Sequence, residues 1–229
     1  MLNNYLGNTI KTKADENYLK EIYTLALDNE HVTTSMLADR LGYSPATVTG
    51  MLKKLARLGW VIYEPYRGVT LTESGRVIAL EVIRHHRLLE TYLVQALNVP
   101  WDKVHEEAEG LEHVLSEYLE ERIDEVLGHP TMDPHGSPIP SHSGSIVNAV
   151  RLHLSDLAVG DQAEIIEIND HDPQLLAHMA QFKLYPLVHF TVTAIEPFDG
   201  LITIRASGQI HVLGRVSAGQ IIVKKLNVS

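Results

Sequence analysis

Two histidines and two glutamates in the middle of the chain are spaced so that a single helix would present them together. They occupy positions i, i+4, i+7 and i+8, which share one face at 3.6 residues per turn. The four residues are His105, Glu109, Glu112 and His113. Upstream, His86 and Glu90 are also four residues apart. Imidazoles and carboxylates on two facing helices are typical of metal sites in helical bundles. Without sulfur, such a set suits Mn²⁺ or Fe²⁺, although Zn²⁺ would also bind.

The alternative interpretation of this stretch is a solvated acidic helix face, and the spacing alone leaves both open. The neighbouring glutamates fit a solvated face better than a ligand set: Glu106, Glu107, Glu117, Glu120 and Glu121. The sequence has no cysteine, which excludes disulfides, zinc–thiolate sites and cysteine nucleophiles.

The net charge of −10 is unevenly distributed along the 229 residues. Residues 1–77 hold 9 lysines and arginines against 8 acidic residues, whereas residues 78–145 hold 4 against 13. The N-terminal third could therefore bind nucleic acid without being repelled by its own surface. The acidic middle third suits divalent cations better than phosphates.

The first third of the chain predicts a winged helix-turn-helix. Helical patterns cover 16–27, 31–43 and 44–60, and the last begins with Ser44 as N-cap and Pro45 in the first turn. Two short helices joined by a glycine-containing turn are typical of this motif. The runs "WVIYE" and "VTLT", separated by "PYRG", predict an appended hairpin, or wing.

The rest of the chain predicts a helical region followed by a small β-structure. Long apolar helices are expected over 76–97 and 101–128, and so much apolar surface predicts a dimer interface. Short strands are expected over 161–168, 189–196, 201–207, 209–215 and 220–226, with a helix over 173–182, which predicts an SH3-like β-barrel. The expected fold is multidomain and mainly α with this barrel: 1–77 DNA-binding, 78–145 metal-binding and dimerisation, 146–154 linker and 155–229 SH3-like.

The second helix of the motif carries small residues where a recognition helix enters the major groove of DNA. Methyl and hydroxyl groups there can contact bases and phosphates, and nearby cations can contact phosphates. A winged helix used for protein contacts is the alternative. The expected DNA-binding residues are Ser44, Pro45, Ala46, Thr47, Thr49, Gly50, Lys53, Lys54 and Arg67.

No run approaches the ~20 apolar residues of a membrane span, and the N-terminus lacks the pattern of a secretory signal. A cytoplasmic protein without a membrane partner is therefore expected.

In this order and spacing, "ENYLKEIY", "RHHRLLE", "VHEEAEGLEHVLSE" and "DPHGSPIP" resemble the diphtheria toxin repressor family. The resemblance covers most of the chain and is strongest over 14–142. It implies a metal-activated repressor of the manganese-sensing branch, with a winged helix, a helical dimerisation domain and a C-terminal SH3-like (FeoA-type) domain.

The resemblance also implies two metal sites. The primary site falls on Asn17, Glu109, Glu112 and His113. The ancillary site falls on His86, Glu90 and His105, with an oxygen ligand expected from Asp172 or, second, Gln174. Iron sensors of the family carry Cys where this chain has Glu109, and Asn17 stands where the family has Met or Asp.

These observations predict a homodimeric, Mn²⁺-activated repressor that binds palindromic double-stranded operator DNA and no small organic substrate. Fe²⁺ is the alternative metal, and Zn²⁺, Co²⁺ or Ni²⁺ would act as surrogates. A His/Glu metalloenzyme is the rival from another class, but the sequence shows no separate nucleophile or phosphate-binding loop.

Overall fold

The computed structural model describes residues 11–146, 151–198 and 200–226. It divides into two compact units, one made of Met1–His85 and Pro140–Ser145 and the other of His86–Ile139 and Ile146–Ser229. Residues 147–150 of the predicted linker and the first ten residues of the chain, where a secretory signal would begin, lie outside the described residues. Within the described ranges, no helix is both long and apolar enough to cross a membrane.

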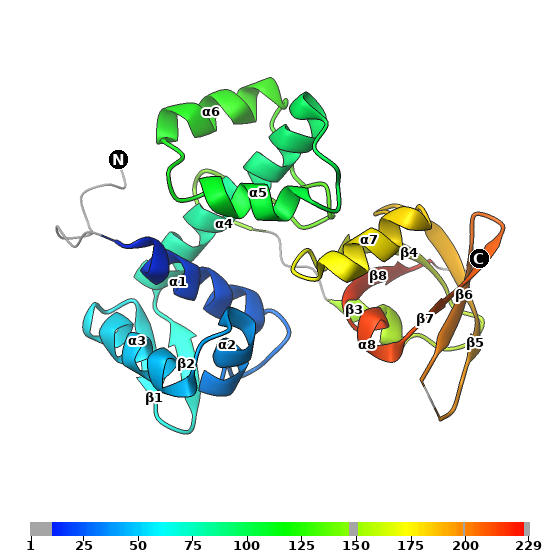
Figure 1. Ribbon diagram of the computed structural model, residues 1–229, viewed down its shortest axis with the longest axis horizontal. Coiled ribbons are helices and arrows are strands. Elements are labelled where there is room, and N and C mark those ends of the chain that lie inside the picture. The colour runs from blue at the N-terminus through cyan, green and yellow to red at the C-terminus, as the bar shows by residue number, and fades with distance from the viewer. Residues whose placement is uncertain (1–10, 147–150, 199, 227–229) are drawn as a thin grey trace. The chain divides into compact units, whose positions relative to one another are not determined.

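The predicted helix-turn-helix and wing are confirmed in the first unit (Figure 1). The Thr33 hydroxyl caps the second helix, which ends at Gly42 with φ +68°, a conformation that glycine adopts without strain. The Ser44 hydroxyl accepts from the Thr47 N–H and starts the third helix. The elements are α1 (Lys13–Ala26), α2 (Thr34–Leu41), α3 (Pro45–Arg57), β1 (Val61–Glu64) and β2 (Gly68–Leu71).

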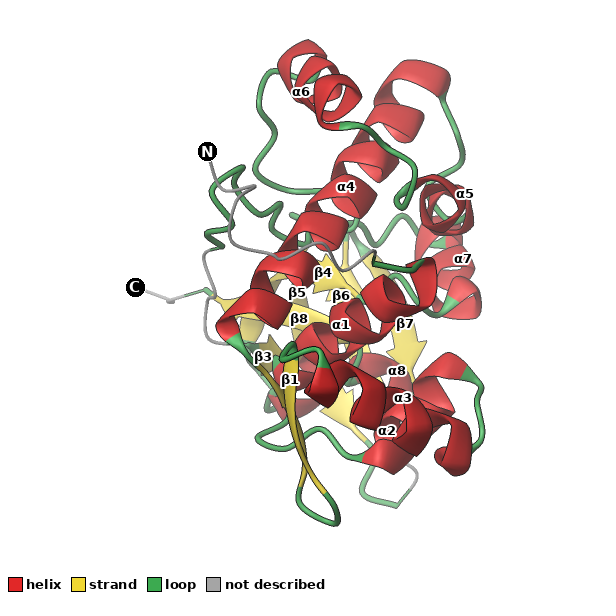
Figure 2. Cartoon of the chain, turned by 90° about the vertical axis from the view of Figure 1, so that its left-hand side faces the viewer, coloured by secondary structure: helices red, strands yellow, loops and turns green. Residues whose placement is uncertain are grey.

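The helical region differs from its prediction in one respect. Helix α4 (Glu73–Leu97) is a single long helix, as expected (Figure 2). The predicted helix over 101–128 is wrong: it is two helices, α5 (Val104–Leu111) and α6 (Glu117–Val126). The reason is local, because the Ser116 hydroxyl accepts from the Leu119 N–H and caps a new helix. His113 therefore lies in the break and not on a helical stripe.

The C-terminal part is an antiparallel sheet of six strands in the order β3-β8-β4-β5-β6-β7. Each predicted strand and the predicted helix are present, but the barrel is wrong, because β3 and β7 remain unpaired edges in the described part of the chain. The elements are β3 (Leu152–His153), η1 (Leu154–Asp156), β4 (Gln162–Ile168), α7 (Pro173–Gln181), β5 (His189–Ile195), β6 (Ile202–Ala206), β7 (Gln209–Leu213), α8 (Arg215–Ala218) and β8 (Ile221–Lys225).

A buried apolar core holds α7 against this sheet. Leu175, Leu176 and Met179 of α7 pack with Ile165 and Ile204 of the strands, and all five side chains are buried. Burying a side chain of this size contributes about 1.5–3 kcal/mol. The loop that joins β4 to α7 is therefore anchored at both ends.

The loop after α6 lies directly against β4. A Cβ added at Gly136 would come within 1.9 Å of the Ile166 carbonyl oxygen, so only glycine permits the approach. The Ile168 N–H also donates to the His135 carbonyl oxygen. This contact fixes the loop around Asp133 and His135 beside the end of β4.

Candidate metal centre and nucleic-acid interface

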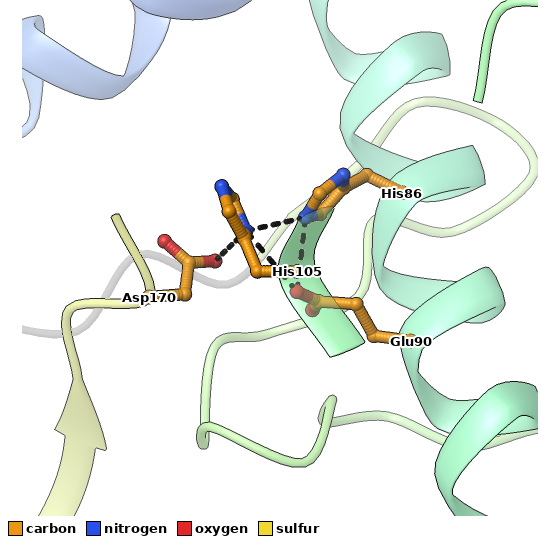
Figure 3. A group of neighbouring side chains, drawn as sticks. All are labelled: His86, Glu90, His105 and Asp170. Carbon is orange, nitrogen blue, oxygen red and sulfur yellow. Dashed lines mark hydrogen bonds and ion pairs between the residues drawn. The ribbon is translucent and has the colours of Figure 1, made fainter. Parts of the chain in front are cut away.

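Three ligand atoms from α4 and α5 form a nearly equilateral triangle (Figure 3). His86 Nε2 lies 3.0 Å from both Glu90 Oε1 and His105 Nδ1, and His105 Nδ1 lies 3.3 Å from Glu90 Oε1. A metal with bonds of about 2.1 Å places adjacent octahedral ligands roughly 3 Å apart. The triangle therefore has the size of one face of an octahedral shell. All three side chains are buried.

The fourth member of this cluster is Asp170, in the loop between β4 and α7. Its Oδ2 lies 3.6 Å from His105 Nδ1, and the four side chains together form a group that could hold a metal ion. The expected ligands Asp172 and Gln174 are not brought to the cluster. The Asp172 carboxylate instead caps α7, accepting from the Gln174 and Leu175 N–H groups, and Gln174 is exposed.

The charges of this cluster depend on one another. Burial alone would raise the pKa of Glu90, but the charge of His86 and the nearby imidazoles of His105 and His135 hold that pKa well below its ordinary value. Burial also disfavours protonated His105, yet contacts with Glu109 and Glu90 raise the pKa of His105 to about 10. At neutral pH the His105 ring is thus protonated, and a metal that binds there would replace this proton.

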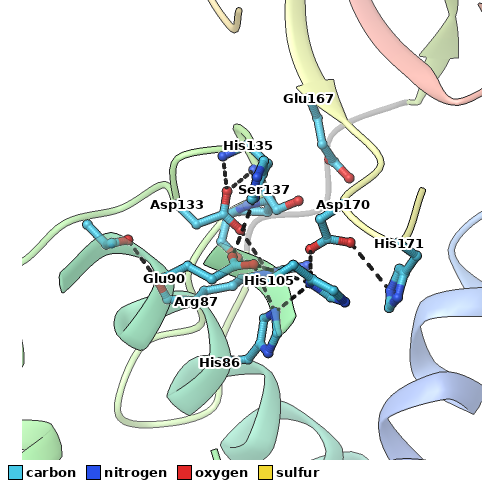
Figure 4. A network of polar contacts seen from close by, with 12 residues as sticks. His86, Arg87, Glu90, His105, Asp133, His135, Ser137, Glu167, Asp170 and His171 are labelled. Carbon is cyan, nitrogen blue, oxygen red and sulfur yellow. Dashed lines mark hydrogen bonds and ion pairs between the residues drawn. The ribbon is translucent and has the colours of Figure 1, made fainter. Parts of the chain in front are cut away.

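A second cluster uses the other oxygen of Glu90 and was not predicted (Figure 4). His135 Nδ1 lies 3.6 Å from Glu90 Oε2, and Asp133 completes the group. Asp133 Oδ1 accepts from the His135 and Ser137 N–H groups, which orders the loop. His135 Nε2 donates to the Trp101 carbonyl oxygen at 3.0 Å, so Nδ1 faces Glu90, an arrangement typical of ligating histidines.

Several buried polar atoms support the fit to a cation. Glu90 Oε2, Asp133 Oδ2 and His135 Nδ1 are buried without a hydrogen-bond partner among the described residues. These atoms have only longer ion pairs, Asp133 Oδ2 with Arg87 Nε at 3.5 Å and Glu90 Oε2 with His135 Nδ1 at 3.6 Å. A bound cation would offset the cost of burying them. Burial and the nearby Glu90 raise the pKa of Asp133 to about 7. A divalent cation would remove this repulsion.

The residues expected at the primary site belong to both units. In the second unit, Glu112 is buried, with Oε2 2.5 Å from His86 Nδ1 and Oε1 3.3 Å from His113 Nε2. Glu109 lies one helical turn after His105, and its side chain is 48% exposed. In the first unit, Asn17 on α1 has a buried Oδ1 without a hydrogen-bond partner among the described residues. Both Asn17 and Glu112 thus offer buried oxygen atoms.

Most of the expected DNA-binding residues lie on the exposed face of α3, opposite its buried side chains Val48, Leu52 and Leu55. Thr49 is half-buried, and its hydroxyl donates to the Pro45 carbonyl oxygen. The exposed set on α3 and at its N-cap is Ser44, Pro45, Ala46, Thr47, Gly50 and Lys53. Arg67 is exposed on the wing and contacts Glu64 at 3.1 Å.

Lys54 differs from the other expected contacts because it links two helices of the first unit. Its Nζ lies 2.5 Å from Asp15 Oδ1, and the Asp15 side chain is buried. Burial tends to raise the pKa of Asp15, but the hydrogen bonds from Lys54 and Thr12 lower it overall. Lys54 thus connects α3 to the start of α1.

Comparisons with known proteins agree with the two kinds of site. Residues 12–69 match the family described as "Iron dependent repressor, N-terminal DNA binding domain". Residues 72–141 match its "metal binding and dimerisation domain", and residues 152–225 match the "FeoA domain". The three matches cover most of the described chain.

Individual relatives extend over the same regions. The chain is 33% identical to the iron-dependent repressor IdeR of Mycobacterium leprae, over 77% of this chain and 82% of the relative. It resembles the solved structure of a manganese-dependent transcriptional repressor in complex with manganese at 40% identity and a TM-score of 0.87, over 93% of this chain and 100% of that one. ScaR with bound Zn²⁺ is similar at 31% identity and a TM-score of 0.82, over 93% and 99%.

Proposed function

Because the chain belongs to the iron-dependent repressor family, a non-enzymatic family of metal-dependent, DNA-binding transcriptional repressors, we propose that it is a Mn²⁺-activated repressor. The observation that carries this proposal is the buried cluster of His86, Glu90, His105 and Asp170. The expected cellular location is the cytoplasm, where the operator DNA is found.

The choice of Mn²⁺ rests on ligand chemistry. The candidate clusters offer only imidazole and carboxylate groups, and the chain has no cysteine. Harder oxygen ligands favour Mn²⁺ over metals that prefer thiolate. Glu109 is decisive in this respect, because a carboxylate there replaces the Cys of the family's iron sensors. Fe²⁺ is the alternative, while Zn²⁺, Co²⁺ and Ni²⁺ would act as surrogates.

For the regulatory site we propose Asn17, Glu109, Glu112 and His113, and for the ancillary site His86, Glu90 and His105 with Asp170. The orphaned Asn17 Oδ1 and the buried Glu112 carboxylate support the first set. Mn²⁺, when bound, supplies positive charge that neutralises these carboxylates. Glu90 also serves the Asp133–His135 cluster and is therefore shared.

The link from metal to DNA runs through α1. Asn17 lies on α1, and α1 is joined to α3 by the ion pair between Asp15 and Lys54. A metal bound by Asn17 would therefore act through α1 on α3, the helix that would enter the major groove. Coupling between two such sites is typically ~1–3 kcal/mol, or about 5- to 150-fold in affinity.

A homodimer is proposed from the exposed apolar side chains around α6. Monomeric surfaces rarely carry so many apolar groups close together, and two-fold symmetric dimers are the commonest assembly. The residues are Leu111, Val114, Tyr118, Leu119 and Val126. Such a dimer would bind a palindromic operator with half-sites about one helical turn, or a multiple of it, apart. By family analogy, the regulated genes would serve metal uptake.

The test is an operator-binding titration with metal-free, full-length protein. Operator duplexes are first selected from random DNA in the presence of Mn²⁺, and binding is then followed by fluorescence anisotropy with Mn²⁺, Fe²⁺, Zn²⁺ or chelator. Mn²⁺ is expected to increase affinity at least about 5-fold over chelator. Equal operator affinity with Mn²⁺ and with chelator would show that metal does not control DNA binding. Stronger activation by Fe²⁺ than by Mn²⁺ would favour the iron alternative.

A further inference from the structure

A third group of metal-binding side chains is made of His105, Glu109 and His171. His105 Nε2 lies 3.6 Å from Glu109 Oε1, and the His105 and His171 rings pack edge to face with centroids 4.7 Å apart. His171 follows Asp170 in the loop between β4 and α7, as Figure 4 shows. One ligand atom from each of the three residues lies within 4.8 Å of the others.

We propose that His105, Glu109 and His171 form a further cation site, which shares His105 with the ancillary site and Glu109 with the regulatory site and which binds Zn²⁺ and similar borderline divalent ions in preference to Mn²⁺. The other members of the His86–Glu90–His105–Asp170 cluster face His105 Nδ1, whereas Glu109 faces His105 Nε2. The two nitrogens point away from each other across the imidazole ring. The two groups therefore share His105, and Glu109 lies at the ring nitrogen opposite the one that faces the first cluster.

The geometry requires only small adjustments to accept an ion. Zinc bonds to histidine nitrogen and carboxylate oxygen are about 2.0–2.2 Å, which places tetrahedral ligand atoms roughly 3.5 Å apart. The His105–Glu109 separation of 3.6 Å already matches this value. His171 could close the remaining gap by rotating its side chain.

The ligand chemistry sets the preference. Two imidazoles and one carboxylate form a nitrogen-rich set, for which Zn²⁺ has higher affinity than Mn²⁺ in the usual order of divalent metals. Asp170 Oδ1 lies 3.4 Å from His171 Nε2, the kind of carboxylate contact that orients ligating histidines.

This group is also more accessible than the first cluster. The Glu109 side chain is 48% exposed and that of His171 is 20% exposed, whereas Glu90 is fully buried. Water can therefore complete the coordination shell and the ion can enter from solvent. A site of this kind would exchange metal faster than the buried cluster.

The shared His105 determines how the site must be tested. A neutral imidazole offers one lone pair to a metal, so His105 serves one group at a time unless it loses its second proton. Replacing Glu90 by Gln weakens the first cluster without touching Glu109 or His171. In this background, the effect of removing His171 on Zn²⁺ binding is measured with the first cluster already weakened.

The experiment measures Zn²⁺ bound to metal-free, full-length protein by equilibrium dialysis at chelator-buffered free Zn²⁺. Starting from Glu90→Gln, the second change is His171→Ala or, as a matched control, His178→Ala, an exposed histidine on α7. His171→Ala is expected to weaken one Zn²⁺ equivalent at least 10-fold, and His178→Ala is expected to leave it unchanged. His171→Gln replaces His171→Ala if the alanine variant does not fold by circular dichroism.

Equal Zn²⁺ binding by the His171 and His178 variants would overturn the site. A matched measurement with Mn²⁺ in the wild-type background tests the preference: His171→Ala is expected to keep its Mn²⁺, and a loss as large as for Zn²⁺ would overturn the selectivity. No DNA is present in either assay. Failure of this inference is therefore distinguishable from failure of the repressor function, which is measured by operator affinity.

Discussion

Asp170 Oδ2 lies 3.6 Å from His105 Nδ1, so the loop after β4 contributes a carboxylate to a cluster otherwise built by α4 and α5. The contact joins the FeoA-type domain to the metal-binding helices within one compact unit. It gives the C-terminal domain a direct part in the proposed ancillary site.

Replacing Asp170 by Asn is expected to weaken Mn²⁺ binding at this cluster by about 10-fold or more, as is typical when a close carboxylate partner is lost. Isothermal titration calorimetry on metal-free protein measures the effect. Asp172→Asn is the matched control, because Asn is an equally good N-cap and the helix should remain intact. If Asp172→Asn weakens Mn²⁺ binding as much as Asp170→Asn, the assignment of Asp170 is wrong.

Gly50 is expected to lower the free energy of unfolding and to raise the affinity for operator DNA. It lies in the interior of α3, is exposed, and a Cβ there would meet nothing within 4 Å in the chain. A helical glycine costs about 1 kcal/mol relative to alanine, and no packing contact in the first unit requires it. Gly50→Ala should therefore raise the free energy of unfolding by up to ~1 kcal/mol while lowering operator affinity, because the added methyl group keeps the helix from the groove.

Urea denaturation and operator binding of the same Gly50→Ala preparation check the two effects. Ala46→Gly, at another exposed position of α3, is the control for the general cost of glycine in this helix. An increase in stability with unchanged operator affinity would show that Gly50 does not approach DNA.

The ion pair between Asp15 and Lys54 should make stability depend on pH. Because the pKa of Asp15 is lowered in the folded state, its contribution is fully present above the ordinary carboxyl pKa of about 4 and is lost as pH falls through the folded value. Asp15→Asn is expected to cost about 1 kcal/mol at pH 7, a value reduced because Lys54 is partly exposed. The difference in unfolding free energy between wild type and variant should shrink as pH falls below 4.

Metal removal should destabilise the second unit. In metal-free protein Glu90, Asp133 and His135 keep buried polar atoms without hydrogen bonds. Mn²⁺ at 100 times its Kd should raise the free energy of unfolding by about 2.7 kcal/mol, which thermal melts with Mn²⁺ and with chelator will measure. In Glu90→Ala the shift should be much smaller, because Glu90 serves two clusters. An undiminished shift would place the stabilising metal elsewhere.

The sequence was sufficient where local rules decide the structure. Ser44 and Pro45 start α3, Gly42 ends α2, and the spacing of His86 and Glu90 predicted two side chains that do meet at the cluster. The break at Ser116 was missed because the apolar period continues across it, and only the capping hydrogen bond to Leu119 interrupts the helix.

The sequence did not predict the contacts between residues that lie far apart along the chain. His135 and Asp133 lie about 45 residues from Glu90, and they meet it because Gly136 allows the loop to reach β4. Asp170 and Asp172 are chemically equivalent in sequence, and only the cap of α7 removes Asp172 from the site. The signal that could have pointed to His135 is its position between a capping Asp133 and Gly136, which is typical of an ordered loop.

We propose that metal bound by Asn17 and Glu109 controls DNA binding, and the affinity of Glu109→Ala for operator DNA is the measurement that decides this. Affinity is measured for wild type and variant with Mn²⁺ and with chelator, together with the oligomeric state of both. We expect the Mn²⁺-dependent gain of about 5-fold or more in wild type and no such gain in the variant, with the dimer unchanged. A Glu109→Ala protein that responds to Mn²⁺ as wild type does would contradict it.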